Sequence, residues 1–133
     1  MLRVKTTVGP SAVHGVGLFA DEDVPRGTVV WERSSLDVVL LSSDVALLTD
    51  VDRDFVYEYG TFCMHLGTWF VCLDNTRFIN HASSRVANLV STDRQIDSVN
   101  IAARRIRKGE ELTIGNATTC DAVRGSNPDY VGN

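Results

Sequence analysis

Residues 74–81 place side chains that could bind a ligand directly after two bulky apolar ones. Phe78 and Ile79 are followed at once by Asn80 and His81, which carry an amide and an imidazole. An apolar anchor beside two hydrogen-bonding side chains suits a buried segment that holds a polar ligand. Asn80 could equally cap a turn, and His81 could be an ordinary histidine near the surface. These residues alone therefore leave a ligand site and a plain turn both open.

Two further segments bear on this choice. Gly15 and Gly17 interrupt an apolar stretch at residues 13–20, and glycine inside a strand often marks the close approach of a ligand or of another backbone. They do not form a dinucleotide fingerprint, because a third glycine and a following helix are missing. A glycine bulge in a hairpin is the simpler alternative. The last segment, residues 102–114, contains the run Gly109-Glu110-Glu111-Leu112-Thr113.

In this order and at this spacing, the three segments resemble the SET domain, the β-fold family of S-adenosylmethionine-dependent protein-lysine methyltransferases. The resemblance covers about residues 3–117, and its compact form is similar to the small SET proteins of bacteria and large DNA viruses. It implies a mainly β fold of several small curved sheets, with one short helical insert and a C-terminal pseudoknot that brings residues 109–116 beside residues 77–81. We expect a SET domain over residues 1–117, followed by a short tail, residues 118–133, that could cover the cofactor or the lysine channel.

The resemblance also implies which residues bind S-adenosylmethionine. They are expected to be His14, Gly15, Val16, Gly17, Asn80 and His81. The backbone of the first four would lie along the cofactor, and glycine would be needed there because a Cβ would obstruct the approach. Asn80 would hold the polar end of the cofactor, and His81 would bond the adenine through its backbone. The imidazole of His81 is therefore not expected to act as a general base.

The implied reaction is an in-line displacement in which a neutral lysine amine attacks the methyl carbon of a sulfonium. Placing the two reactants in line is most of the work, and in the family a tyrosine hydroxyl orients the amine. Asn116 stands where the family places that tyrosine, and Cys120 stands where it places a second ring that tunes the number of methyls added. The sequence therefore predicts a protein-lysine methyltransferase. The alternative is a catalytically weakened or inactive SET-like binding module that keeps the cofactor pocket.

Other tyrosines could replace the missing hydroxyl. Tyr57 and Tyr59 fall where similar compact proteins carry another active-site tyrosine, although either ring could simply pack against the core. Tyr130 is the only Phe, Trp or Tyr in the last 55 residues, and it could fold back over the cofactor or the lysine channel. We name Tyr57, Asn116, Cys120 and Tyr130 as the candidate catalytic positions.

Composition limits the partners. The chain has 133 residues, 44% of them hydrophobic, which suits one globular domain. A formal charge of −4 disfavours nucleic acid as a direct ligand and permits a basic, lysine-containing peptide or protein. Because no apolar run approaches a membrane span and residues 1–5 do not begin a signal peptide, we expect a cytoplasmic protein without a membrane partner. Three dispersed cysteines, Cys63, Cys72 and Cys120, predict neither a disulfide framework nor a metal site.

Short apolar or alternating runs, bounded by glycine, proline and polar residues, predict the strands that must position these segments. Strands are expected at residues 2–8, 13–20, 28–32, 69–73, 87–90, 98–102 and 112–114. One helical region is expected from residue 42 to about residue 59, with Ser43 as its N-cap and Gly60 as its end. The result is a β-dominated domain with one short helical insert.

Overall fold

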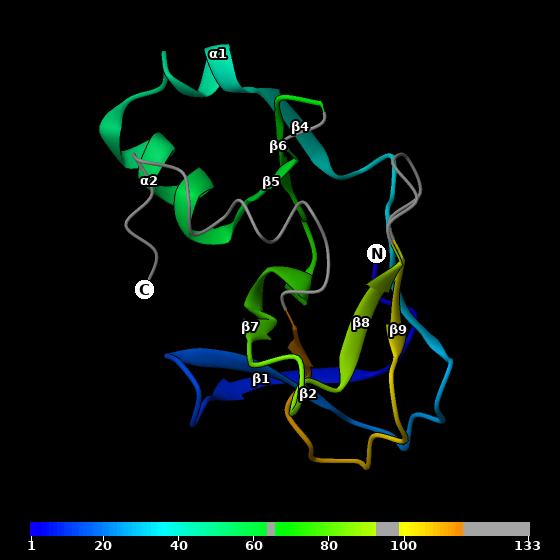
Figure 1. Ribbon diagram of the computed structural model, residues 1–133. Helices are drawn as coiled ribbons and strands as arrows, with labels where there is room; N and C mark the ends of the chain where they lie inside the picture. Colours follow the sequence, from blue (N-terminus) through cyan, green and yellow to red (C-terminus); the bar gives the residue numbers. More distant parts are fainter. Residues whose placement is uncertain (64–65, 93–98, 116–133) are drawn as a thin grey trace.

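The computed structural model describes residues 1–63, 66–92 and 99–115. Within these ranges the chain forms three small β-sheets, two α-helices and one 3-10 helix (Figure 1). The helices are α1 (Ser42–Val45), α2 (Asp50–Tyr59) and the 3-10 helix η1 (Asn75–Phe78). The strands are β1 (Thr6–Pro10), β2 (Val16–Ala20), β3 (Val29–Glu32), β4 (Val38–Leu41), β5 (Thr61–Cys63), β6 (Thr68–Val71), β7 (Asn80–His81), β8 (Leu89–Thr92), β9 (Val99–Ala102) and β10 (Thr113–Ile114). This confirms the expectation of a mainly β fold made of several small sheets.

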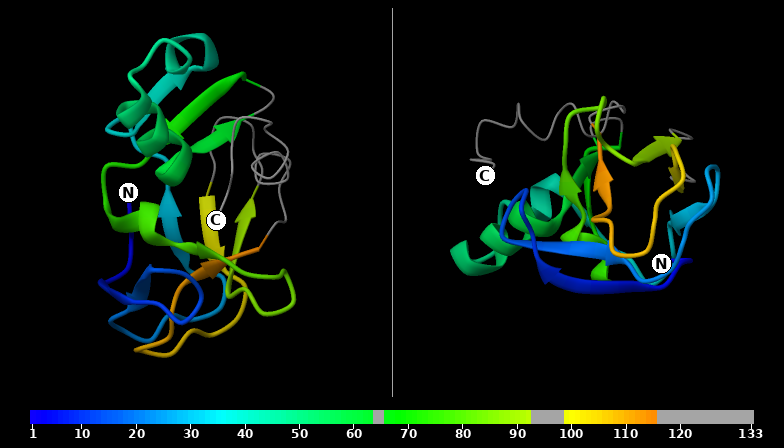
Figure 2. Two further views of the ribbon diagram at one scale, coloured as in Figure 1. Left: turned by 90° about the vertical axis from the view of Figure 1, so that its left-hand side faces the viewer. Right: turned by 90° about the horizontal axis from the view of Figure 1, so that it is seen from below.

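The three sheets lie in different parts of the molecule. β1 and β2 form an antiparallel hairpin, and β4, β6 and β5 form a second antiparallel sheet in that order. The largest sheet has the strand order β3-β9-β8-β10-β7. Figure 2 shows α1, α2 and the β4-β6-β5 sheet together at one end of the molecule, with the β1-β2 hairpin at the other end.

β10 lies between β7 and β8 and runs parallel to both. Thr113 is in register with Asn80, and Ile114 is in register with both His81 and Leu89. β7 and β8 follow one another in the chain, so the last strand is inserted between two strands that residues 82–88 connect. The expected pseudoknot is confirmed as far as residue 115. Residue 116 and the rest of the tail lie outside the described residues.

β2 is hydrogen-bonded along both of its edges. One edge pairs with β1, where Gly9 is opposite Gly17. The other edge meets the segment before β10: the Leu112 N–H donates to the Leu18 carbonyl at 2.7 Å, and the Gly109 N–H donates to the Ala20 carbonyl at 2.7 Å. The glycine-containing strand is therefore held between the N-terminal strand and the C-terminal segment of the domain.

The larger core cluster packs around this arrangement. Alternation along β2 buries Leu18 and Ala20 on one face, at 0% and 2% exposure. Side chains from β3, β8, β9 and the 106–114 segment complete the cluster. Its buried members are Leu18, Ala20, Val24, Val30, Leu89, Ala102, Ile106, Leu112 and Ile114, with Phe78 and Ile79 packed against them. The apolar anchor beside Asn80 thus belongs to the main core.

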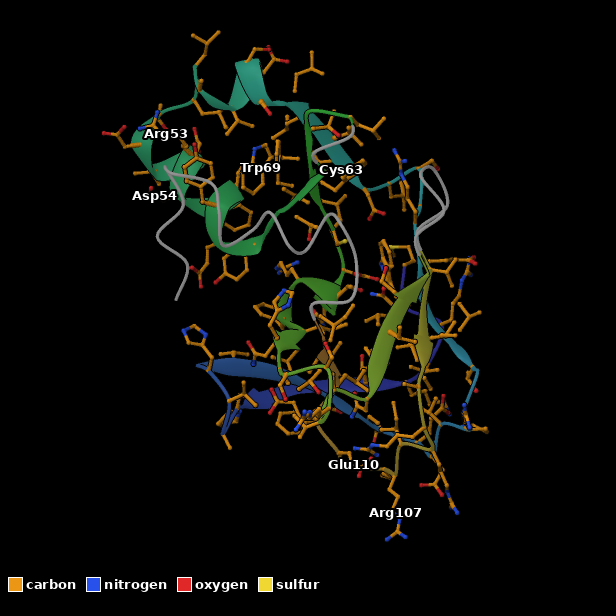
Figure 3. All side chains as sticks on the ribbon, in the orientation of Figure 1. Arg53, Asp54, Cys63, Trp69, Arg107 and Glu110 are labelled. Atoms are coloured by element: carbon orange, nitrogen blue, oxygen red, sulfur yellow. The ribbon has the colours of Figure 1, made fainter. Side chains whose placement is uncertain are left out.

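The insert between β3 and η1 has a separate, smaller core. Its buried apolar residues are Val45, Val56, Trp69 and Val71. In Figure 3, Trp69 lies between α2 and the β-sheet of the insert, whereas Arg53 and Asp54 lie on the outer side of α2. This unit includes two strands, β4 and β5, that the sequence did not predict. Val38, Val39 and Leu41 of β4 are exposed, so apolar residues do not alternate between a buried and a solvated face.

The helical region also differs from the expectation. It consists of two helices instead of one, and Ser43 does not cap it: α1 has no side-chain cap, and Thr49 caps α2 by accepting a hydrogen bond from the Asp52 N–H. The Thr49 hydroxyl in turn donates to the Asp52 carboxylate at 2.8 Å, which resembles a capping box. Gly60 ends α2 as expected, because its backbone is extended while its N–H still donates to the Val56 carbonyl. An added Cβ there would lie 2.4 Å from the Val56 carbonyl oxygen, so glycine suits this position.

Within the described ranges, no helix has both the length and the apolar character that a membrane span requires. A search of the same residues finds no group of three or more His, Cys, Asp or Glu side chains that could hold a metal ion.

Candidate functional site

Asn80 is the point at which three distant segments meet. Its side-chain Nδ2 lies 3.0 Å from the His14 carbonyl and 3.1 Å from the Val16 carbonyl. The same nitrogen lies 3.1 Å from Ser11 Oγ and 2.9 Å from Glu111 Oε1. The amide of Asn80 therefore joins β7 to residues 11–17, which we call the glycine loop, and to the segment that leads into β10.

The contact with Val16 continues a row of backbone hydrogen bonds. The carbonyls of Ala20 and Leu18 accept from the backbone N–H groups of Gly109 and Leu112. The next carbonyl on the same edge of β2 is that of Val16, and it receives the Asn80 side chain instead. The side-chain amide of Asn80 thus donates to the Val16 carbonyl in the place of a backbone N–H group. This contact excludes the interpretation of Asn80 as a plain turn cap.

Ser11 organises the loop before β2. Its Oγ accepts from the backbone N–H groups of Val13 at 2.9 Å and His14 at 3.1 Å. Its hydroxyl donates to Glu111 Oε1 at 2.6 Å, and its own N–H donates to the Gly15 carbonyl at 2.9 Å. Gly15 has φ of +46°, in the left-handed region that glycine adopts at little cost. The loop is therefore turned back on itself around one hydroxyl.

Gly17 lies directly against the Glu111 carboxylate. A Cβ built on Gly17 would lie 2.3 Å from Glu111 Oε1 and 3.0 Å from the Ser11 Cβ. The missing side chain therefore makes room for the Glu111 carboxylate, and the expected approach of the cofactor to Gly17 stays a prediction.

A second asparagine, Asn88, binds the backbone of the segment that threads between β7 and β8. It is only 2% exposed. Its Nδ2 donates to the Glu111 carbonyl at 2.7 Å, and its Oδ1 accepts from the Thr113 N–H at 2.9 Å. Asn88 therefore satisfies one donor and one acceptor of the backbone that threads between β7 and β8, which fixes Glu111 in place.

The site is rich in hydrogen-bond acceptors. An amide nitrogen carries two hydrogens, yet four oxygen atoms lie within 3.1 Å of Asn80 Nδ2. Asn80 Oδ1 receives no hydrogen bond from any residue that the structure describes. One of the four oxygens belongs to a carboxylate. Such a cluster fits a ligand that carries positive charge and N–H donors.

The segment before this site is anchored by Asp74. Its carboxylate accepts from the Leu2 N–H at 2.7 Å and from the Thr76 N–H at 3.0 Å. Burial alone would raise the pKa of this carboxyl, but hydrogen bonds from Thr76 and from the Leu2 backbone outweigh it, so the pKa lies below its ordinary value of 3.8. Nearby, burial raises the pKa of the Cys72 thiol to about 12, with Asp37 and Asp74 adding to the shift. Cys72 is therefore a protonated packing residue.

Comparison with known proteins identifies this arrangement. The family model described as "SET domain" matches residues 15–115. The chain belongs to the SET-domain family. The match includes Gly15 and Gly17, the Asn80-His81 pair and the strand that threads beside them, so the resemblance seen in the sequence is confirmed.

Curated SET relatives include human histone-lysine N-methyltransferase 2D, which is 32% identical over 114 residues, and human histone-lysine N-methyltransferase 2B, which is 35% identical over 112 residues. Each match covers 77% of this chain. The chain spans only 2% to 4% of the length of these relatives.

Solved structures show the same fold. A candidate histone methyltransferase of Plasmodium falciparum has a TM-score of 0.62 at 15% identity, covering 89% of this chain and 97% of that one. The Chaetomium thermophilum Polycomb Repressive Complex 2, in an autoinhibited conformation bound to S-adenosylmethionine, has a TM-score of 0.63 at 20% identity, covering 86% of this chain and 15% of that one. At these identities the likeness establishes the SET-type fold.

The structure brings most of the expected cofactor residues of the SET domain together. His14 and Val16 contact Asn80 through their carbonyls, and Gly17 lies against Glu111. His81 lies in β7, in register with Ile114.

The candidate catalytic residues are placed only in part. The Tyr57 ring lies 5.2 Å from Trp69, in the small core of the insert. Tyr59 lies on the side of the site instead: its ring is 5.9 Å from Phe78, two residues before Asn80. Asn116, Cys120 and Tyr130 lie outside the described residues.

Sequence reasoning missed Ser11 and Glu111 as parts of the site. Ser11 stands three residues before His14, and this position is the local signal of a hydroxyl that binds backbone N–H groups. Glu111 had no comparable signal, because its partners are up to 100 residues away in the chain.

Proposed function

We propose that this chain is a methyltransferase domain that moves a methyl group from S-adenosylmethionine to a lysine of a peptide or protein. The observation that carries the proposal is the acceptor cluster around Asn80, which joins the glycine loop to the threaded segment. Membership of the SET family and the histone-lysine methyltransferase relatives support the same activity.

The described residues fit the cofactor. S-adenosylmethionine carries an α-ammonium and a sulfonium, and the cluster offers the backbone carbonyls of His14 and Val16 and the Asn80 Oδ1, with the Glu111 carboxylate behind them. The residues that would hold the cofactor are His14, Gly15, Val16, Gly17, Asn80 and His81. When bound, the cofactor would supply an electrophilic methyl group, and the chain would hold it in line with the lysine amine.

The proposed substrate is a lysine within a basic peptide or protein. The chain carries a formal charge of −4. Exposed acidic side chains on and near α2 add to a field that attracts basic segments: Asp44, Asp50, Asp52, Asp54 and Glu58. A cytoplasmic location is part of the same proposal and is tested by cell fractionation.

The residue that orients the lysine amine remains a proposal. Asn116 stands at the position of the family tyrosine, and Tyr57, Cys120 and Tyr130 are the other candidates. Of the tyrosines in the insert, the contact with Phe78 favours Tyr59 as the ring nearer to Asn80.

The proposal is tested by incubating the purified chain with methyl-labelled S-adenosylmethionine and a mixture of lysine-rich basic proteins. Label should appear on lysine, and Asn80→Ala should reduce it by about tenfold or more, because the cofactor loses its polar contact. Glu110→Gln serves as the control, because the Glu110 carboxylate pairs with Arg104 away from Asn80. Cofactor binding without any transfer would favour the binding module, and the absence of both would refute the proposal.

A further inference from the structure

Two side chains outside the expected cofactor residues determine how Asn80 is oriented. Ser11 Oγ and Glu111 Oε1 lie 3.1 Å and 2.9 Å from Asn80 Nδ2, and they are 2.6 Å from one another. Ser11 comes from the loop before β2, and Glu111 comes from the segment that leads into β10. The three residues thus form a closed triangle of hydrogen bonds across segments 69 and 100 residues apart in the chain.

We propose that Ser11 and Glu111 are positioning residues for the cofactor, acting through Asn80 and through the loop at residues 13–16. This inference rests on the proposed function. Their role is to keep Nδ2 of Asn80 turned inward and Oδ1 turned toward the ligand, where it accepts from the cofactor ammonium.

Glu111 determines which end of the Asn80 side-chain amide faces inward. The oxygen and nitrogen of an asparagine side chain have nearly the same shape, so the surrounding groups decide which end faces inward. An ionised carboxylate only accepts, and the backbone carbonyls of His14 and Val16 only accept. The inward end must therefore be the nitrogen. A glutamine at position 111 would keep the shape but add N–H donors, which could bond to Oδ1 of an inverted Asn80.

Ser11 holds the loop at residues 13–16 in place. Its Oγ holds the N–H groups of Val13 and His14, while its hydroxyl is donated to Glu111. Removing the hydroxyl releases both N–H groups and leaves Glu111 with one donor fewer. The carbonyls of His14 and Val16 would then no longer be held toward Asn80.

Gly17 supports the same assignment independently. The space beside its Cα is filled by Glu111, since an added Cβ would lie 2.3 Å from Oε1. The carboxylate lies in the space that the glycine leaves, and its Oε1 is also hydrogen-bonded to Ser11 and Asn80.

The test uses the whole chain with and without cofactor. In the absence of cofactor, the side-chain amide resonances of Asn80 in a ¹H–¹⁵N spectrum should shift in Glu111→Gln and in Ser11→Ala. By calorimetry, both variants should bind S-adenosylmethionine about 10- to 100-fold more weakly than wild type. Ser11→Thr keeps the hydroxyl and should restore most of the affinity. Glu110→Gln is the matched control, because Glu110 pairs with Arg104 away from Asn80 and should change neither readout.

The outcomes separate this inference from the proposed function. If wild type binds the cofactor and Glu111→Gln and Ser11→Ala bind equally well, the positioning role is wrong and the proposed function stands. If wild type does not bind, both are wrong. Glu111→Gln is nearly isosteric and keeps the test valid should Ser11→Ala unfold. A loss of affinity in Glu110→Gln as large as in Glu111→Gln would also overturn the inference.

Discussion

The two ends of the molecule are stabilised in different ways. The end that carries the glycine loop and Asn80 buries nine apolar residues, and two asparagines complete the backbone hydrogen bonds of its crossing strands. Among the described residues, the core cluster of the insert at the other end contains four buried apolar residues. Several of its larger apolar side chains face solvent, including Leu41, Leu47, Val51 and Phe55 at 54%, 86%, 79% and 49% exposure.

This difference separates the two tasks of the proposed methyltransferase, which are to hold the cofactor and to orient the lysine. His14, Gly15 and Val16 are exposed and Asn80 is half-buried, but Phe78 and Ile79 beside Asn80 pack against the larger core, and hydrogen bonds join Asn80 to the loop. The geometry of the groups that would hold the cofactor is therefore tied to the larger core. Tyr57 and Tyr59 belong to the lightly packed insert, and regions with few buried apolar contacts open more readily than a core. We therefore expect the cofactor side to be rigid and the insert to adapt.

The largest effect should come from the larger core. Leu18→Ala removes a fully buried side chain and should lower the free energy of unfolding by about 3–5 kcal/mol. Val56→Ala in the insert should cost about 2 kcal/mol, since fewer methyl groups are removed from a smaller cluster. Urea unfolding checks both values. A greater loss for Val56→Ala would show that the insert stabilises the domain more than its buried area suggests.

Substitution of Asn88 should mainly lower stability, whereas substitution of Asn80 should mainly weaken cofactor binding. Asn88→Ala leaves the Glu111 carbonyl and the Thr113 N–H without their buried partner and should cost about 2–4 kcal/mol of stability. Asn80→Ala lies at a more accessible position and should mainly weaken cofactor binding. Thermal unfolding and calorimetry of both variants provide the test. An equal loss of stability in the two variants would contradict the distinction.

The rate of methyl transfer should be limited by Asn116, which lacks a ring hydroxyl. Asn116→Tyr should raise single-turnover methyl transfer by about 10- to 1,000-fold, because a ring hydroxyl would orient the amine. Cofactor affinity should barely change, since the hydroxyl acts on the lysine.

Companion variants at Tyr57 and Tyr130 show which ring acts in the natural chain. If wild type already transfers at ordinary methyltransferase rates and Tyr57→Phe abolishes the activity, Tyr57 orients the amine and the emphasis on Asn116 is wrong. Tyr130→Phe tests the tail in the same assay.

The smallest effect on stability should come from Asp74, which binds the backbone N–H groups of Leu2 and Thr76. Asp74 has a pKa below 3.8 in the folded chain, so its contribution to stability is present above that value and is lost as the pH falls through its folded pKa. Asp74→Asn should therefore lower the free energy of unfolding by about 1 kcal/mol at neutral pH, and the difference should shrink in acid. Urea unfolding of wild type and Asp74→Asn, at neutral pH and in acid, measures the difference in the free energy of unfolding. A difference that grows in acid would contradict the assignment.

Sequence reasoning succeeded where a short segment carries its own signal. The glycines at 15 and 17, the Asn80-His81 pair and the residues around Glu111 each stood out, and the family resemblance placed them side by side. It failed where the structure depends on distant contacts. Rules of chain order do not predict a threaded strand. The exposed apolar residues of β4 gave no alternation, and the roles of Ser11 and Glu111 arise only when the two meet.

The central claim is that the glycine loop and Asn80 bind S-adenosylmethionine. Calorimetric titration of wild type, Gly17→Ala and Gly9→Ala tests it most directly, because these two glycines face one another in the same hairpin. An added Cβ at Gly17 would displace Glu111, whereas at Gly9 it would lie 3.6 Å from Phe19, an ordinary contact. We predict one-to-one binding by wild type and Gly9→Ala, and binding about tenfold weaker or worse by Gly17→Ala. No binding by wild type, or equal binding by all three, would contradict the account.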